Sequence, residues 1–270
     1  MLAHIGLILG LIIMLYPLLW LLSASLRPAN EIFTAKGLWP GTFRWSNYTD
    51  GWYIFSDVTF GTFFANSFLI AIGAIVGNLL SCSMAAYAFA RLQFRFKGVL
   101  FALMLGTIML PYHVLVVPQY IAFLHLGWIN TFYPLIVPKF LATDSFFIFL
   151  MVQFIRGIPR EMDEASEIDG AGFFQIYRRI MLPLMLPALA TTAIFTFIFT
   201  WNDFFTPLLY LTGTEHWTVP LGLRSFLDIE AKSSYGPMFA MSVASLGPIF
   251  GFFLASQRLL VRGIATTGLK

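Results

Sequence analysis

The densest run of charged side chains lies at residues 158–182, between long apolar stretches. Pro159 suits the first turn of a helix, and acidic groups after it favour the positive end of the helix dipole. These acidic groups are Glu161, Asp163 and Glu164. Gly170 and Gly172 then predict a break, and residues 173–180 predict a second helix. A helix, a glycine turn and a helix that display both charge signs suit recognition of a protein partner more than contact with lipid.

A second group of polar side chains lies within an apolar run, at Trp201, Asn202 and Asp203. An indole ring beside a donor and an acceptor suits the hydroxyl groups of a sugar, so these residues are candidates for a substrate pathway. Asn66 lies in another apolar run and is a further candidate. A hydrogen bond between packed helices would explain the same residues, and the sequence leaves both readings open.

Lys139 and Asp144 are a third candidate, because ionisable residues within a membrane span are functional by default. They are five residues apart, about 140° around an ideal helix, so we expect them on different faces. Snorkelling of both side chains to a nearby membrane surface explains them at least as well as a substrate site. Their roles stay open.

The sequence lacks the motifs that several other kinds of functional site require. The sequence has no G-x-x-x-x-G-K-[ST] phosphate loop and no G-x-S-x-G nucleophile elbow. Its four histidines have no metal-ligand spacing, and its single cysteine, Cys82, can form no intrachain disulfide. No basic cluster with interleaved aromatic residues suggests nucleic acid. Because the sequence has no phosphate loop, any ATP hydrolysis must come from a separate subunit.

The elements that position these residues are membrane-spanning helices. The 270 residues are 59% hydrophobic and 11% charged, whereas a soluble domain is about 25% charged, and the mean hydropathy is +0.80. Stretches without Asp, Glu, Lys or Arg are long enough to cross a bilayer. The fold expected is all-α, a single transmembrane domain over residues 1–270. Its six expected spans are about 5–26, 60–87, 98–121, 132–154, 184–209 and 238–257.

Orientation follows from the positive-inside rule. With both termini in the cytoplasm, the inner segments hold ten Lys and Arg residues and the outer segments five. The inner ten are Arg91, Arg95, Lys97, Arg156, Arg160, Arg178, Arg179, Arg258, Arg262 and Lys270. The outer five are Arg27, Lys36, Arg44, Arg224 and Lys232. The first span has no basic head, so it is interpreted as a retained span, and whether the natural start lies upstream stays open.

The segment at 158–182 resembles the EAA signature of ATP-binding-cassette importer permeases. That pattern is Glu-Ala-Ala, three residues, Gly, nine residues, then Ile-x-Leu-Pro. The matching residues are Glu164, Ala165, Ser166, Gly170, Ile180, Leu182 and Pro183. Both spacings are intact, and the one departure is Ser166 in place of the second alanine. The resemblance implies a coupling helix that docks on a cytoplasmic ATPase.

Nearly the whole chain is similar to the carbohydrate branch of these permeases, and it most resembles the six-span, maltose-G-like partner of a heterodimer. The similar pieces are residues 85–91, 109–111, 201–204, 220–223 and 257–258. The resemblance implies a prokaryotic inner-membrane location, a second permease subunit, an ATPase dimer that binds ATP and Mg, and an extracytoplasmic solute-binding protein. It also implies contact of that binding protein with an outer loop, here Thr214, Glu215, His216 and Trp217.

Two classes of function therefore remain. The first is the permease half of an ATP-driven importer for a sugar, oligosaccharide or glycoside, or for glycerol phosphate. The second is an ion-coupled secondary transporter with a regulatory cytoplasmic loop. Secondary transporters often have internal repeats and charged sites at the membrane midplane. The sequence has no convincing repeat, and its charges concentrate at the EAA-like segment, which favours the importer.

Overall fold

The computed structural model describes residues 2–34, 37–53, 55–227 and 234–267, and its regular elements over these ranges are all helical. The predicted all-α class is therefore confirmed. Lys36, Lys232 and Lys270, which entered the charge count, lie outside the described residues. The chain divides into two compact units, unit 1 over Met1–Asn66 and Gly213–Phe250, and unit 2 over Ser67–Thr212 and Gly251–Lys270.

Four stretches within the described residues are long and apolar enough to cross a membrane, and two bent helix pairs bring the number to as many as six. The four stretches are His4–Ser25, Phe60–Arg91, Tyr133–Arg156 and Tyr235–Gln257. The bent pairs are Lys97–Ile108 with Tyr112–His125, at 100°, and Phe173–Leu184 with Leu186–Trp201, at 73°.

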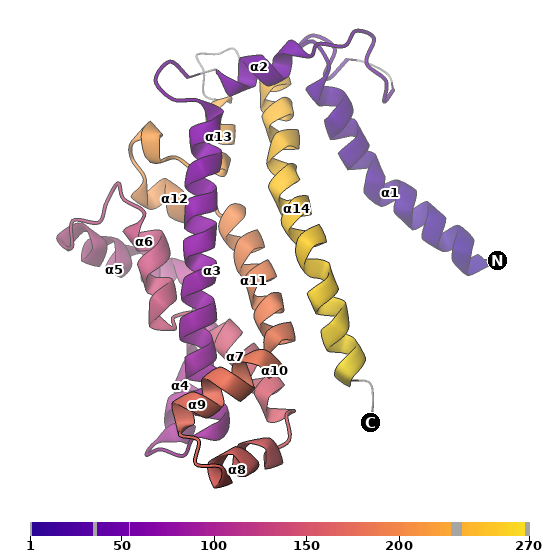
Figure 1. Cartoon of the computed structure of the whole chain (residues 1–270). Coiled ribbons are helices and arrows are strands. Elements are labelled where there is room, and N and C mark those ends of the chain that lie inside the picture. The colour runs from indigo at the N-terminus through magenta and orange to yellow at the C-terminus, as the bar shows by residue number, and fades with distance from the viewer. Residues whose placement is uncertain (1, 35–36, 54, 228–233, 268–270) are drawn as a thin grey trace. The chain divides into compact units, whose positions relative to one another are not determined.

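Unit 1 contains the first helices of the chain, and the chain enters this unit again after residue 212 (Figure 1). Its elements are α1 (Leu2–Ser25), α2 (Ser46–Trp52), the first turns of α3 (Phe60–Arg91), η3 (Thr214–His216), α13 (Val219–Ser225) and the first half of α14 (Tyr235–Thr267). The α1 side chains are almost all exposed, and Ile13 and Met14 are more than 70% exposed. Trp20 of α1 packs edge-on against Phe239 of α14, at 5.4 Å, and the exposed apolar stretch of residues 4–19 suits lipid.

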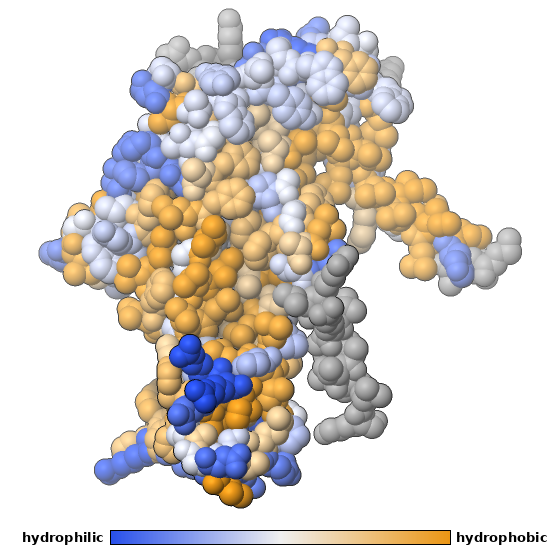
Figure 2. Space-filling model, in the orientation of Figure 1, coloured by the Kyte–Doolittle hydropathy of each residue, from blue (hydrophilic) through white to orange (hydrophobic). Residues whose placement is uncertain are grey.

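Unit 2 holds most of the charged side chains considered above. Its elements are the rest of α3, α4 (Lys97–Ile108), α5 (Tyr112–His125), α6 (Tyr133–Ile136), η1 (Val137–Leu141), α7 (Ser145–Arg156), α8 (Glu161–Ile168), α9 (Phe173–Ile176), the π-helical turn η2 (Tyr177–Met181), α10 (Leu182–Leu184), α11 (Leu186–Trp201), α12 (Phe205–Tyr210) and the end of α14. On the face seen in Figure 2, hydrophobic side chains cover most of the helices, and hydrophilic ones gather around the region of α8 and α9.

The core of unit 2 joins α3 to α7 and to the stretch from α9 to α11. It contains small residues of α3, such as Cys82 and Ala86, and larger ones such as Met151 and Ile155 of α7. Tyr177 and Met181 of η2 are buried in the same cluster. Gly73 and Gly77 of α3 allow residues 136–140 to pack closely against the helix. A Cβ at Gly77 would lie 2.9 Å from backbone and side-chain atoms of Lys139. A β-carbon there would force the two segments apart.

Three predicted spans are interrupted in the structure. Residues 98–121 form two helices, because Pro111 has an extended backbone and no amide hydrogen to continue α4. Residues 132–154 contain a left-handed residue, Ala142 with φ of 54°, between η1 and α7. In the stretch 184–209, α11 ends at Trp201 and a separate helix, α12, starts at Phe205.

Candidate functional site

The helix α8 ends in a glycine turn of the Schellman type. Gly170 is left-handed, with φ of 81°. Its N–H donates to the carbonyl of Glu167 at 3.0 Å, and the N–H of Ala171 donates to the carbonyl of Ser166 at 2.9 Å. These are the two hydrogen bonds that define the motif, which needs a residue with positive φ after the helix cap. The predicted helix, glycine turn and helix are therefore present, and Gly170 is the residue whose backbone requires glycine.

The matched motif residues lie along this segment, partly exposed and partly packed. Glu164, Ala165 and Gly170 are exposed. Ser166 donates its hydroxyl to the carbonyl of Met162 at 2.7 Å, so serine satisfies its own polar group within the helix and leaves the exposed face unchanged. Ile180 and Leu182 are partly buried and pack against the core of unit 2, and Pro183 is exposed in α10.

Exposed apolar side chains lie on both sides of the glycine turn in the sequence. Ile168 is 86% exposed, Phe174 67% and Phe173 63%. Ile168 ends α8, Phe173 and Phe174 begin α9, and the first turn of α8 has three acidic groups. An exposed apolar group rimmed by charges is typical of a surface that another protein covers.

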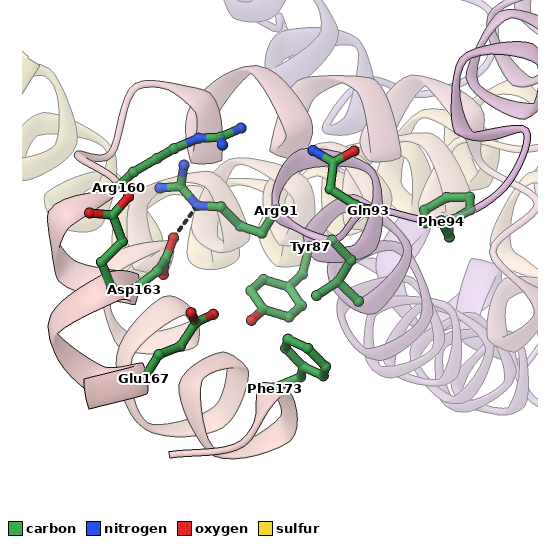
Figure 3. Close-up of a pocket in the computed structure, with 10 residues that line it drawn as sticks. Tyr87, Arg91, Gln93, Phe94, Arg160, Asp163, Glu167 and Phe173 are labelled. Carbon is green, nitrogen blue, oxygen red and sulfur yellow. Dashed lines mark ion pairs between the residues drawn. The ribbon is translucent and has the colours of Figure 1, made fainter. Parts of the chain in front are cut away.

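The C-terminal turn of α3 holds this segment through Arg91. Its Nε lies 2.7 Å from Oδ2 of Asp163 in α8, and its Nη2 donates to the carbonyl of Ile158 at 2.7 Å. Figure 3 shows the pair, with Tyr87, Glu167 and Phe173 beside it. Both charged side chains are nearly buried, with 6% of Arg91 and 14% of Asp163 exposed. The same residues line a cavity of about 460 Å³ between the end of α3 and α8.

Burial changes the acidity of this carboxyl group. Desolvation raises the pKa of Asp163 above its ordinary value, because burial disfavours the charged form, and Glu167 and Glu164 act in the same direction. The guanidinium of Arg91, helped by Arg160, opposes the rise. The pair therefore depends on close contact between its two charges.

Lys139 and Asp144 correct one expectation from the sequence. They were expected on different faces of one helix, but the ammonium of Lys139 lies 2.9 Å from Oδ2 of Asp144. The helix is not continuous between them: η1 ends at Leu141 and α7 begins at Ser145. The left-handed Ala142 turns the chain back, which brings the two side chains together.

Asn78 of α3 completes this cluster. It is fully buried, and its amide donates to Oδ2 of Asp144 at 2.6 Å and to the hydroxyl of Thr196 at 3.1 Å. The cluster borders a cavity of about 490 Å³. The cavity is lined by Asn78, Thr107, Ile108, Leu115, Lys139, Thr143, Asp144, Ser145, Phe146, Phe147, Thr196, Phe199 and Thr200. One amide, several hydroxyls, one ion pair and aromatic rings can bind a polar solute through hydrogen bonds and stacking.

Asn78 and Thr196 were not among the residues predicted from the sequence. The available signal was an amide inside an apolar run of α3, where a polar side chain needs a partner. Asn66 was chosen on the same argument, but Asn78 was not. Its partners lie 66 and 118 residues further along the chain, so no local spacing could have shown them.

The predicted pathway residues in α11 and beyond contact other parts of the protein: the ring of Trp201 lies 4.8 Å from that of Phe68 in α3. Trp201 is buried, at 2% exposed, and its ring stacks 5.4 Å from that of Phe197. Asn202 is exposed and donates to the carbonyl of Ile198 at 2.8 Å. Asp203 accepts a hydrogen bond from the backbone N–H of Thr206 at 3.1 Å, in the first turn of α12.

Two separately predicted groups meet in unit 1. The amide of Asn66 donates to the backbone carbonyls of Glu215 and Trp217, each at 2.9 Å. The loop at 214–217 was predicted to contact a binding protein, and Asn66 was predicted in a substrate pathway. Glu215 is exposed, whereas Thr214, His216 and Trp217 are partly buried. Asn66 therefore fixes the backbone of this loop. Over the described residues, His, Cys, Asp and Glu form no group of three that could hold a metal.

Known proteins are similar to this chain over most of its length. A family described as "Binding-protein-dependent transport system inner membrane component" matches residues 77–266. The arabinooligosaccharides transport system permease protein AraQ of Halalkalibacterium halodurans is 34% identical, over 96% of this chain and 92% of that protein. The sn-glycerol-3-phosphate transport system permease protein UgpE of Yersinia pestis is 30% identical, over 97% and 94%.

A further relative and a solved structure extend this likeness. The diacetylchitobiose uptake system permease protein NgcG of Streptomyces coelicolor is 29% identical, over 97% of this chain and 86% of that protein. A crystal structure of a bacterial ABC transporter involved in the import of the acidic polysaccharide alginate has the same fold, with a TM-score of 0.83 over 95% of this chain and 94% of that chain, at 22% identity. Since the family match covers most of the sequence, the chain belongs to the binding-protein-dependent transport system inner membrane components.

Proposed function

We propose that the chain is the transmembrane permease subunit of an ATP-driven importer for a sugar, oligosaccharide or glycoside, or for glycerol phosphate. The observation that carries the proposal is the α8–Gly170–α9 segment of a chain in this family. Its residues have the spacing of the EAA motif, and its surface has exposed apolar and acidic side chains. The names of the relatives supply the substrate class. Membership of the family favours this function over a secondary transporter.

The topology we propose has six spans in one transmembrane domain over residues 1–270. The first bent pair counts as one span, and Leu186–Trp201 is the membrane-spanning part of the second, which gives six with the four single stretches. Both termini then face the cytoplasm, and α8 lies on the cytoplasmic side of the inner membrane. Ten basic residues on the inner side against five on the outer side support this orientation.

Segment 158–182 is the coupling element in this proposal. A cytoplasmic ATPase dimer binds ATP and Mg and docks on α8 and the glycine turn, where Glu164 and Ala165 are exposed. Ile180 and Leu182 anchor the segment to the core of unit 2. A second permease subunit pairs with this chain, and the two halves work by alternating access. This chain itself performs no hydrolysis.

The substrate pathway in unit 2 passes the cavity at Asn78. Its amide and hydroxyl groups and its aromatic rings match the hydroxyls and ring faces of a sugar. A cysteine at Thr200, which lines the cavity, should react with a water-soluble thiol reagent, whereas the buried native Cys82 should not. Asn202 and Asp203 remain candidates for the same pathway. A Thr200→Cys variant that stays unlabelled with and without ATP would place the pathway elsewhere.

The outer loop at Thr214, Glu215, His216 and Trp217 is the proposed contact for the solute-binding protein, held in place by Asn66. A photo-cross-linker at the exposed Glu215 should trap the binding protein in the assembled complex. A cross-linker at the exposed Phe174 should trap the ATPase instead. The exchange of these two partners, or the failure of both, would contradict the proposed topology.

The proposed function as a whole is tested by reconstitution. The chain, its candidate permease partner and ATPase are purified together and placed in vesicles with the binding protein. We expect uptake of a radiolabelled oligosaccharide that needs ATP and the binding protein. Uptake that instead follows a proton or sodium gradient without ATP would establish a secondary transporter.

A further inference from the structure

We propose that Arg91 and Asp163 are positioning residues, whose ion pair fixes α8 to the last turn of α3 and thereby transmits movement of α8 to the cavity at Asn78. The inference rests on the proposed function, because an ATPase must act on α8. It adds to the EAA motif, since neither residue is one of its matched positions. It also assigns α3 a mechanical role that its apolar sequence does not indicate.

Three side chains on one face of α3 hold the segment. Ser83, Tyr87 and Arg91 are spaced four residues apart, so they lie above one another on the helix. The hydroxyl of Ser83 lies 2.7 Å from that of Tyr177, and the ring of Tyr87 lies 5.4 Å from the ring of Tyr177. Arg91 makes the contact that reaches α8 itself, through Asp163.

The geometry of the pair suits a fixed link. One guanidinium contacts both a carboxylate within α8 and a backbone carbonyl just before it, at 2.7 Å each. The ion pair through Nε and the hydrogen bond through Nη2 hold the guanidinium at two points of the segment, and Nε of Arg91 and Oδ1 of Asp163 have no hydrogen-bond partner. The surface pair Arg44–Asp50 differs: it is 3.4 Å long, with 51% and 45% of the side chains exposed. A solvated pair of that kind can separate at little cost.

α3 carries the link to the cavity. It is one helix from Phe60 to Arg91. Asn78, which binds Asp144 and Thr196, lies thirteen residues before Arg91, or about 20 Å along the axis at 1.5 Å per residue. Small α3 residues between them, Cys82, Ala86 and Ala90, are packed in the core. A packed helix transmits a shift at one end to the other, because the interior resists compression.

The test uses the full complex in vesicles, with wild-type chain, Asp163→Asn, Arg91→Gln, and the charge-reversed pair Arg91→Asp with Asp163→Arg. For the single variants we expect the complex to assemble and ATP-driven uptake to fall roughly tenfold, within the usual range of coupling between sites. The reversed pair should recover a large part of the uptake. Asp50→Asn, which breaks the exposed pair, is the matched control and should transport normally.

A second measurement tests the link if the charge-reversed side chains cannot form an ion pair. Cysteines that replace Arg91 and Asp163, in a Cys82→Ala background, are joined by a short bifunctional thiol reagent. Cross-linking should restore uptake to a variant that is inactive before it. Restoration by either route supports the proposal.

Three results would overturn the inference. The first is normal uptake in Asp163→Asn and Arg91→Gln. The second is a failure of these variants to assemble, which would make the pair merely structural. The third is the absence of any restoration by reversal and by cross-linking. If the wild-type complex itself shows no ATP-driven uptake of any tested sugar, the proposed function fails instead, so the two failures are distinguishable.

Discussion

Two ion pairs in unit 2 differ in the way that they are held. Arg91–Asp163, at the C-terminal end of α3, is 2.7 Å long, with only 6% and 14% of its side chains exposed. Lys139–Asp144, beside the middle of α3, is 2.9 Å long, with 30% and 26% exposed. The first joins two helices far apart in sequence, and the second joins residues on either side of a helix break.

The difference indicates different roles. A nearly buried pair holds its partners in one arrangement, because separating it would leave an uncompensated charge away from water. Both pairs line a cavity, but the more exposed Lys139–Asp144 pair keeps contact with water and can exchange partners with a polar solute. We therefore interpret the end of α3 as a fixed attachment and its middle as the wall of a pathway.

The largest effect is expected for Gly170→Val, in the glycine turn that ends α8, the helix attached to α3. Its φ of 81° is a conformation that a β-branched residue adopts only with strain, about 1–2 kcal/mol. No atom lies within 4 Å of an added β-carbon, so backbone conformation alone is tested. The strain shifts the end of α8, and we expect ATP-driven uptake in vesicles to fall at least roughly tenfold.

Gly172 provides the matched control. It has an ordinary φ of −76°, and an added β-carbon would also meet nothing within 4 Å. Gly172→Ala should therefore transport like the wild type. Equal activity of Gly170→Val and Gly172→Ala, at equal expression, would separate the turn from coupling.

A smaller effect is expected at the cavity, for Asp144→Ala. The change removes the counter-ion of Lys139 and the acceptor of Asn78. Because the pair is about a quarter to a third exposed, solvent screens it, and we expect a loss of about 1–2 kcal/mol in the free energy of unfolding. Thermal unfolding of the purified complex measures the loss. Lys139→Ala combined with Asp144→Ala should be less destabilised than the sum of the single variants.

The double-mutant cycle sharpens the contrast between the pairs. A coupling energy as large as that of a fully buried pair, about 3–5 kcal/mol, would show that Lys139–Asp144 is also a structural lock. Unaltered uptake in the stable double variant would argue against a pathway at this cavity. Lower uptake with preserved stability is the result that we expect.

A third effect is expected next to the pathway, at Asp203. Its carboxylate accepts from the backbone N–H of Thr206 and so begins α12. Asp203→Ala should cost about 1 kcal/mol of unfolding free energy, whereas Asp203→Asn keeps a good capping group and should cost only a few tenths. Thermal unfolding separates the two. If Asp203→Asn nevertheless changes the affinity of uptake, the charge serves the substrate in addition to the helix.

How far the sequence predicts this molecule depends on the range of the contacts. The helix, glycine turn and helix at 158–182 were predictable, because caps, breakers and the motif are local patterns. Charge-free runs likewise located the apolar stretches. The link between Arg91 and Asp163, and the cluster of Asn78, Asp144 and Thr196, required knowledge of which helices touch.

The error at Lys139 and Asp144 has a specific physical source. The prediction placed both on one ideal helix, where five residues correspond to about 140°. Pro138 had suggested a distorted backbone, but a left-handed alanine has no sequence signal, because alanine is the best of the helix formers. The turn goes with close packing of η1 against Gly77 of α3, a contact between segments far apart in the sequence.

The smallest effect is expected from pH at the fixed attachment. Burial raises the pKa of Asp163, with Glu164 and Glu167 adding to the rise and Arg91 and Arg160 opposing it. Because the pKa in the folded state is above the unfolded value, the folded state binds this proton more readily. Acidification through the window between the two pKa values therefore favours the folded state at this residue. Only the charge of the ion pair is lost.

The expected outcome is thus a loss of coupling on acidification without a loss of stability from Asp163. Uptake and thermal unfolding of the reconstituted complex are measured from neutral pH downwards, for wild type and for Asp163→Asn. Normalised to its own neutral value, wild-type uptake should fall more steeply on the acid side, because the asparagine has no charge to lose. Asp50→Asn, whose partner Arg44 is exposed, should follow the wild type. If wild type and Asp163→Asn instead have the same normalised acid limb, the charge of Asp163 plays no part in transmission, and the buried pair would differ from the exposed ones in packing alone.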